Sequence, residues 1–309
     1  MYIVTGVGGF VSSAVAEHLL GEVDPAEIIV TSRDEQTLER WRARGVDARR
    51  ADYEDRDALV EAFRGGERLF LVSAMEAGPS RQRQHRNAVE AAVEAGVQHI
   101  VYTSFIGTER PEVNSVEVAD HKVTEALILG SRLGWNILRN NQYADAMAEN
   151  QAAIAITSGR SIGNAGEGRV GFVARADVAE VAARVLLGEG EPDTAYDVTG
   201  PELLTYREVG EMIAELSGAP IEIVDLTDDE MYAMWDALGV PRDATGDFSN
   251  SPVPWASDGM VTFGRMIRAG HLGRLTDVVE RFTGRPPRAL RELMLERRAG
   301  WPPVPEPAA

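Results

Sequence analysis

The sequence contains no cysteine, and Lys122 is the single lysine among its 31 basic residues. The absence of cysteine excludes disulfide bonds, thiolate metal sites and a cysteine nucleophile. The five histidines do not show the spacing of metal ligands. We therefore expect a protein without a bound metal.

Long apolar runs are also missing, since no stretch reaches the roughly eighteen apolar residues of a membrane span. The sequence starts on the apolar residues Tyr2 to Val4 without a basic leader, so we expect a cytoplasmic protein. A net charge of −18 repels the phosphates of nucleic acids. The expected partners are small molecules, with no nucleic acid and no membrane, and a homodimer is the one self-association that we consider.

The 309 residues are 44% hydrophobic, which is enough to build a large core. In the first half, apolar runs alternate with amphipathic patterns of helical length. The strands expected are Tyr2 to Thr5, Glu27 to Thr31, Val46 to Arg49, Arg68 to Val72, His99 to Thr103 and Trp135 to Arg139, with helices over 10–21, 34–44, 56–64, 80–96 and 117–133. This repeat predicts an α/β protein with a Rossmann doubly wound parallel sheet.

The alternation loosens after about residue 150, where helical patterns dominate. We expect a glycine-rich patch over 161–171, a helix over 174–187, a short strand over 196–198, a helix opened by a Thr205 and Glu208 capping box, a loop over 241–255 and a frayed tail over 301–309. We divide the chain into a Rossmann domain over 1–155, with return segments around 172–200, and a smaller, mostly helical substrate domain over 156–309.

A glycine-rich turn, Thr5-Gly6-Val7-Gly8-Gly9-Phe10-Val11, joins the first predicted strand to the first predicted helix. Such glycines let the backbone approach a pyrophosphate, and the N–H groups of the helix N-terminus then face the ligand. A tight turn without a ligand has similar residues, but the position within a first βαβ unit favours a dinucleotide. We predict cofactor contacts from Thr5, Gly6, Gly9, Phe10 and Val11.

The end of the second predicted strand, Thr31-Ser32-Arg33, indicates which dinucleotide binds. Enzymes that use NAD carry an acidic residue here, whereas a guanidinium with neighbouring hydroxyls suits a 2′-phosphate. We predict NADP(H) in preference to NAD(H). A solvated Arg33 is the alternative, and the adjacent Asp34 is a competitor for the guanidinium.

Other polar residues follow the later strands, at the edge of a parallel sheet where ligands bind. The Asp52-Tyr53 pair would flank an adenine ring, although both could be ordinary loop residues. We add to the predicted cofactor site Asp52, Tyr53, Ser73, Ala74, Thr103 and Asn140.

Taken together, these motifs identify a family. They are Thr5-Gly6-x-x-Gly9, Arg33, Asp52-Tyr53, Tyr102-Thr103-Ser104, His121-x-x-Thr124-Glu125, Leu138-Arg139-Asn140-x-x-Tyr143, Arg175-x-Asp177-Val178-Ala179 and Thr283-Gly284-Arg285-Pro286-Pro287. The sequence resembles the NmrA-like atypical short-chain dehydrogenase/reductases, especially the quinone reductase and triphenylmethane reductase group. The resemblance implies an NADP-bound Rossmann domain, a smaller domain closing over the cleft, and reduction of quinones or dye-like aromatic acceptors. Some relatives bind the dinucleotide as redox sensors without catalysis.

The sequence departs from ordinary short-chain reductases, which use a Tyr-x-x-x-Lys pair for proton transfer. Val118 stands four residues before Lys122, and Glu117 stands four residues before His121. The resemblance implies a role for a histidine at position 121. Our candidates for catalysis are His121, Tyr143, Ser104 and Lys122, and the alternative for each is a structural role.

The second half of the sequence is richer in aromatic residues and methionine, which suit an adaptable pocket for a flat apolar molecule. We predict acceptor contacts from Tyr143, Trp235, Trp255 and Phe263, although core packing is an alternative for each. The function predicted is an NADPH-dependent oxidoreductase that transfers hydride to a small apolar or aromatic acceptor such as a quinone. The alternatives are a non-catalytic NADP(H) sensor that binds a protein partner and an isomerase or epimerase that uses a bound nucleotide.

Overall fold

The computed structural model describes residues 1–243, 246–253 and 255–305. Within these residues a seven-stranded parallel sheet runs in the order β3-β2-β1-β4-β5-β6-β9. Its strands are β1 (Tyr2–Val4), β2 (Ile28–Ser32), β3 (Asp47–Arg50), β4 (Arg68–Leu71), β5 (His99–Phe105), β6 (Gly134–Asn140) and β9 (Thr194–Val198). The strand order reverses between β1 and β4, so the predicted Rossmann doubly wound sheet is confirmed.

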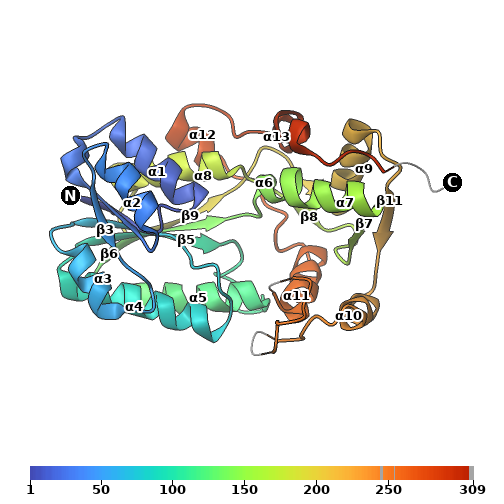
Figure 1. Cartoon of the computed structure of the whole chain (residues 1–309), viewed down its shortest axis with the longest axis horizontal. Helices are drawn as coiled ribbons and strands as arrows, with labels where there is room; N and C mark the ends of the chain where they lie inside the picture. Colours follow the sequence, from blue (N-terminus) through green and yellow to red (C-terminus); the bar gives the residue numbers. More distant parts are fainter. Residues whose placement is uncertain (244–245, 254, 306–309) are drawn as a thin grey trace.

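Helices cover both faces of this sheet (Figure 1). One face carries α1 (Phe10–Leu20), α2 (Glu35–Arg42), α8 (Arg175–Arg184) and α12 (Val278–Thr283), and the other carries α3 (Arg56–Phe63), α4 (Pro79–Ala95) and α5 (Val116–Leu129). Successive strand residues point to opposite faces. In β1, for example, Val4 packs with the first group of helices and Ile3 with the second.

Local chemistry fixes where these helices begin. The side chains of Asp34, Asp55 and Ser115 each accept a hydrogen bond from the backbone N–H three residues later, at the starts of α2, α3 and α5. Pro79 occupies the first turn of α4, and Gly96 ends that helix with a φ of 84°. These signals explain why the predicted helices match the observed ones to within a few residues.

The remaining elements form a mostly helical lobe at one end of the sheet (Figure 1). It contains α6 (Ala144–Ala146), a π-helical turn (Met147–Gln151), α7 (Ala152–Ser158), α9 (Tyr206–Ser217), α10 (Asp228–Ala237), α11 (Ser257–Arg268) and α13 (Leu290–Arg297). Two small sheets pair β7 (Arg160–Gly163) with β11 (Glu222–Asp225) and β8 (Arg169–Val170) with β10 (Leu204–Thr205). The predicted capping box of Thr205 and Glu208 opens α9.

The chain returns to the sheet twice after leaving it. First, α8 packs on α1 and β9 pairs with β6. Later, Val278, Val279 and Phe282 of α12 enter the apolar core between the sheet and α8. The division at residue 155 stays a prediction, and the return through α12 is an element that the sequence analysis did not assign to the sheet.

The C-terminal segment is anchored at Trp301. Its indole N–H donates to the carbonyl of Ala148 at 2.7 Å, and its ring packs against the core of the helical lobe. The expectation of a frayed tail is therefore wrong at its start. Residues 244–245 and 254 of the predicted loop and 306–309 of the predicted tail lie outside the described residues.

Candidate cofactor and acceptor site

The turn between β1 and α1 leaves the N-terminus of α1 open. Gly6 has a φ of 66°, and the N–H of Gly9 donates to the carbonyl of Gly6 at 3.0 Å. Gly9 is the N-cap of α1, and no side chain in the described part of the chain caps this helix. The first N–H groups of α1 are therefore free to bind an anion, as the sequence predicts for this turn.

A cavity of about 490 Å³ lies beside the turn, between α1 and α2. The predicted contact Phe10 lines it and is 49% exposed, while Val11 is buried behind the turn. Arg40 of α2 and Arg44, just after α2, also line the cavity, and sequence reasoning missed both. Arg44 is paired with Glu17 of α1, whereas Arg40 donates to Thr37. Both arginines therefore line the cavity beside the glycine turn with side-chain partners of their own.

Arg33 follows β2 and extends into solvent, with a side chain that is 70% exposed. One of its nitrogens lies 3.9 Å from a carboxylate oxygen of Asp52. Asp34, the predicted competitor, instead accepts hydrogen bonds from the N–H and hydroxyl of Thr37, which lower the pKa of its carboxyl. Arg33 is therefore available to an incoming phosphate, with Asp52 as its weak partner.

Tyr53 points its hydroxyl into the sheet. This hydroxyl lies 2.6 Å from Thr5 Oγ1 and 2.9 Å from the carbonyl oxygen of Val72, and burial raises the pKa of the phenol. Thr5 Oγ1 in turn donates to the carbonyl of Phe70 at 3.0 Å. Tyr53 and Thr5 thus tie together the ends of β1 and β4 beside the glycine turn.

The ends of β4 and β5 are held together by side chains. Thr103 Oγ1 accepts from the N–H of Ser73 at 2.8 Å, and His85 Nε2 accepts from the N–H of Ala74 at 2.9 Å. His85 Nδ1 then donates to Thr124 Oγ1 at 2.8 Å. Sequence reasoning missed His85, because nothing near position 85 marks it as a partner of position 74.

A buried pair, Tyr102 and His121, lies between β5 and α5. The phenol oxygen and His121 Nδ1 are 2.6 Å apart. Burial lowers the pKa of His121 and raises the pKa of Tyr102, so both side chains are neutral near pH 7. The imidazole stacks on Phe105, which contacts Phe263 of α11. The predicted residues His121 and Phe263 therefore share one aromatic cluster.

Ser104 donates to a carboxylate oxygen of Glu125 at 2.5 Å. Arg139 binds both oxygens of that carboxylate, at 2.7 and 3.1 Å, and Thr108 donates to it at 2.6 Å. Ser104 therefore keeps its oxygen lone pairs as acceptors for a ligand. Glu125 and Arg139 occur in the family motifs, but the sequence analysis did not name them as site residues.

The two other catalytic candidates sit in different surroundings. The ammonium group of Lys122 donates to the carbonyls of Arg110 and Val113 at 2.6 and 2.7 Å, and so holds the loop after β5. The Asn140 amide lies 3.4 Å from the Tyr143 hydroxyl, and burial raises the pKa of Tyr143. Asn140 Oδ1 is buried and has no hydrogen-bond partner within the described residues.

The predicted acceptor residues of the helical lobe are not all together. Trp255 is 51% exposed, and its indole nitrogen lies 2.9 Å from the sulfur of Met260. Trp235 of α10 is half-buried, and Phe263 contacts Phe105 at the end of β5. Phe263 therefore reaches the edge of the large sheet.

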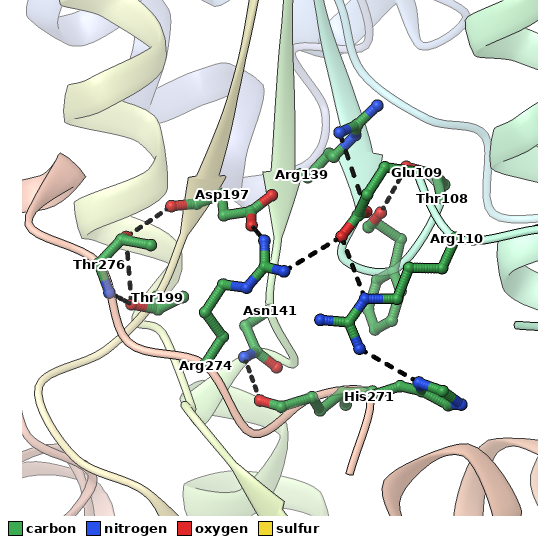
Figure 2. Close-up of polar contacts among 12 residues, drawn as sticks. Thr108, Glu109, Arg110, Arg139, Asn141, Asp197, Thr199, His271, Arg274 and Thr276 are labelled. Carbon is green, nitrogen blue, oxygen red and sulfur yellow. Dashed lines mark hydrogen bonds and ion pairs between the residues drawn. The ribbon is translucent and has the colours of Figure 1, made fainter. Parts of the chain in front are cut away.

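A polar cluster fixes the lobe to the sheet at this edge (Figure 2). Arg274 forms ion pairs with Asp197 of β9 and, at 3.4 Å, with Glu109. The N–H of Thr276 donates to Thr199 at 2.9 Å. The segment between α11 and α12 is therefore bound across the carboxyl ends of β5, β6 and β9.

In the described part of the chain, no helix has the length and apolarity needed to cross a membrane. The same residues contain no group of three or more histidine or acidic side chains arranged to hold a metal ion.

Comparison with known proteins identifies the family. The model of a family described as NAD(P)H-binding matches residues 6–189. The sequence is 30% identical over 260 residues to Quinone oxidoreductase 2 of Escherichia coli, a match that covers 84% of this chain and 90% of that protein.

Solved structures give the same result. The NADPH complex of an NADPH-dependent quinone oxidoreductase from Escherichia coli superimposes with a TM-score of 0.84 and 28% identity, covering 96% of this chain and 99% of the other. The NADP(H) complex of triphenylmethane reductase from Citrobacter sp. gives a TM-score of 0.82 and 26% identity, covering 96% and 100%. The chain therefore belongs to the NAD(P)H-binding family, within the NmrA-like group of atypical short-chain dehydrogenase/reductases that its motifs indicate.

Proposed function

We propose that this protein is an NADPH-dependent reductase that transfers hydride to a small apolar acceptor, such as a quinone or a dye-like aromatic compound. The observation that carries the proposal is the uncapped N-terminus of α1, at a turn where Gly6 has positive φ and Arg33 stands at the end of β2. The similarity to quinone oxidoreductase and triphenylmethane reductase supports the acceptor class.

The residues fit the dinucleotide. The N–H groups after Gly9 suit the pyrophosphate, and Phe10 and Val11 follow in the first turn of α1. Arg33, beside Asp52, suits the 2′-phosphate. Bound NADPH supplies the hydride from its nicotinamide C4.

On the nicotinamide side, Thr103 fixes Ser73 and His85 fixes Ala74, so that the backbone after β4 has a defined path along the cofactor. The Ser104 hydroxyl donates a hydrogen bond to Glu125, and its oxygen would accept a hydrogen bond from the cofactor. We assign Asn140 to the same site, because its buried Oδ1 has no partner in the described structure.

On the acceptor side, we assign contacts to His121 and Tyr143 and a positioning role to Lys122. His121 is a neutral imidazole whose Nδ1 is hydrogen-bonded to the Tyr102 hydroxyl. We therefore assign it the orientation of a ligand and not the stabilisation of a negative charge. Lys122 holds the loop after β5 through backbone carbonyls. Reduction would then depend mainly on the alignment of acceptor and nicotinamide.

Arg33→Ala tests the cofactor part of the proposal. The unmodified protein should bind NADPH more tightly than NADH, and the variant should lose roughly ten- to a hundredfold of that preference, as expected for a charge-assisted contact. Calorimetry with both cofactors measures it. Arg56→Ala, which removes an arginine from the ion pair with Glu94 on the other face of the sheet, serves as the control. Equal affinities for NADPH and NADH in the unmodified protein would contradict the proposal.

A panel of quinones and dyes, followed by the loss of nicotinamide absorbance, tests the reductase activity. Turnover with any of these acceptors supports the proposal. Tight NADPH binding without turnover would favour the non-catalytic sensor, which the absence of a Tyr-x-x-x-Lys pair also suggests.

The proposal also includes a cytoplasmic location, where NADPH is regenerated, and small molecules as partners. The charge of −18 supports the exclusion of nucleic acids. Light scattering during size-exclusion chromatography distinguishes a monomer from the homodimer.

A further inference from the structure

The two nitrogens of the His121 imidazole have different surroundings. Nδ1 lies 2.6 Å from the phenol oxygen of Tyr102. Nε2 has no hydrogen-bond partner in the described part of the chain, yet it is not among the fully buried polar atoms that lack a partner. His121 is 6% exposed, and this exposure therefore includes Nε2. The Nε2 edge is the part of His121 that a ligand can reach.

The length of the contact between Tyr102 and His121 indicates which side chain donates. O–H donors form hydrogen bonds of about 2.7–2.8 Å, whereas N–H donors form longer bonds of about 2.9–3.0 Å. At 2.6 Å the phenol is therefore the donor and Nδ1 is the acceptor. A neutral imidazole that accepts at Nδ1 carries its proton on Nε2. Burial keeps His121 neutral by lowering its pKa, and the Arg81 guanidinium adds to this effect.

The Tyr102 side chain is held in place by its neighbours. It is fully buried, and its ring meets the His85 imidazole edge-on, with the ring centres 5.7 Å apart. His85 is itself fixed by its hydrogen bonds with Ala74 and Thr124. The Tyr102 hydroxyl therefore meets His121 Nδ1 in one orientation. The sequence analysis placed Tyr102 in a family motif but gave it no role.

The open edge of His121 lies at the acceptor side of the site. Phe105, the last residue of β5, stacks on the imidazole with the ring centres 6.2 Å apart, and Phe263 of α11 contacts Phe105. Phe105 thus covers one face of the imidazole and Tyr102 covers Nδ1, which leaves the Nε2 edge at the carboxyl end of β5. Ligands bind at this end of the strands in open α/β sheets.

We propose that Tyr102 is a positioning residue of the reductase, which keeps the imidazole proton of His121 on Nε2 so that Nε2–H donates a hydrogen bond to the compound being reduced. This inference rests on the proposed function and deepens it, because it names the atom that contacts the compound and the residue that sets the tautomer. A donor that is fixed before binding orients the compound beside the nicotinamide with a smaller loss of conformational freedom.

Nitrogen NMR of the imidazoles in the full chain tests the tautomer without any measurement of activity. The signals of His121 are those that His121→Asn removes. We expect a protonated Nε2, an unprotonated Nδ1 and no titration between about pH 5 and 8. A proton on Nδ1 of the wild-type protein would overturn the proposal.

A double-mutant cycle tests whether Tyr102 acts through His121. Tyr102→Phe keeps the ring and removes the donor, so it should lower kcat about tenfold and leave NADPH affinity unchanged. The same change in His121→Asn should have no further effect on kcat, because the imidazole that it orients is gone. Losses that multiply would show a purely structural role. Tyr196→Phe is the matched control and should keep the wild-type kcat, since its buried hydroxyl accepts the N–H of Glu191 at 2.7 Å beside β9.

A second pair of variants keeps the test decisive if Tyr102→Phe does not fold. Glutamine places an amide N–H near the position of Nε2, whereas the shorter asparagine places it near Nδ1. His121→Gln should therefore retain most of the wild-type kcat, and His121→Asn should lose about tenfold or more. Equal losses in the two variants would overturn the role of Nε2–H. A protonated Nε2 in a protein that oxidises NADPH with no acceptor would instead contradict the reductase proposal, while the tautomer set by Tyr102 would stand.

Discussion

At the scale of single residues, hydrogen bonds decide the protonation of the buried histidines. His85 Nε2 accepts the N–H of Ala74, and this leaves the proton on Nδ1, which donates to Thr124. Thr124 then donates to the carbonyl of Asp120 at 3.1 Å. Protonation of His85 would place an Nε2–H group against the backbone N–H of Ala74, so this network requires the neutral imidazole. Burial lowers the pKa of His85 to about 3.

The depressed pKa makes stability depend on pH in a defined direction. In the unfolded chain His85 titrates near 6.5, so between that pH and about 3 the unfolded state binds the extra proton. The contribution of neutral His85 to the free energy of unfolding is fully present above pH 6.5. It is lost as the pH falls from 6.5, by up to about 1.4 kcal/mol per pH unit. His121 contributes in the same direction, because its pKa is also lowered.

Urea unfolding at a series of pH values tests this prediction with His85→Gln. The free energy of unfolding should fall less steeply below pH 6.5 in the variant than in the wild type. His18→Gln, at the exposed end of α1, is the control and should keep the wild-type slope. Identical slopes for His85→Gln and wild type would show that His85 is not neutral in the folded protein.

At the scale of elements, the turn between β1 and α1 contains one glycine that the fold requires and one that it does not require. Gly6 has positive φ, and a Cβ atom there would lie 2.9 Å from a methyl group of Val72. Gly9 has a φ of −92°, and an added Cβ would meet the carbonyl oxygen of Gly6 at an ordinary 3.5 Å. The fold therefore requires glycine at position 6 but not at position 9, which leaves the cofactor as the reason for Gly9.

Gly9→Val should therefore abolish NADPH binding while the protein remains folded, because the side chain fills the space beside the first N–H groups of α1. Gly6→Ala should instead lower the melting temperature, since alanine is strained at positive φ. Calorimetric titration with NADPH, together with thermal unfolding, measures both effects. Gly300→Val is the control, because no heavy atom of the described residues lies within 4 Å of an added Cβ there. Unchanged NADPH affinity in folded Gly9→Val would show that the pyrophosphate binds elsewhere.

The elements themselves were predictable because their signals are local. The alternation of apolar runs and helical patterns predicts the first six strands of the sheet, and Asp34, Asp55 and Ser115 mark helix starts by their own side chains. The short β7 and β8 in the predicted glycine-rich patch were missed. Each contains a single branched apolar residue, Ile162 or Val170, so no apolar run marks these strands.

At the scale of the whole molecule, the contacts that complete the site join distant parts of the sequence. Asn141 donates to the carbonyl of Leu272, which is 131 residues away. Arg274 reaches Asp197, and Thr276 donates to the carbonyl of the same residue, across 79 residues (Figure 2). A sequence shows these residues only as single charges or hydroxyls on a polar loop. Motifs predict the cofactor half of the site, and that assignment stays a prediction. No motif predicts the contacts of Asn141, Arg274 and Thr276 between the lobe and the sheet, which we call the latch.

Arg274 is the centre of this latch, so its removal should loosen the lobe without disturbing the cofactor half. Burial raises the pKa of Asp197, and the guanidinium of Arg274 opposes this shift. Arg274→Met would leave Asp197 and Glu109 without that partner at the edge of the sheet. Since Arg274 is 38% exposed, solvent screening keeps the cost below that of a fully buried pair, and we expect a loss of about 1–3 kcal/mol in unfolding free energy.

The matched control is Arg291→Met, which breaks an exposed ion pair with Glu215 and should lower the free energy of unfolding less than Arg274→Met does. Because the latch holds the segment after α11, whose Phe263 meets Phe105 at the acceptor side, Arg274→Met should also raise KM for the acceptor. The affinity of Arg274→Met for NADPH should stay at the wild-type value. The glycine turn and Arg33 follow β1 and β2, on the half of the sheet away from β5, β6 and β9. Steady-state kinetics and calorimetry on both variants measure these effects. An equal loss of NADPH and acceptor affinity would show that the lobe and the sheet respond as one unit rather than through this latch.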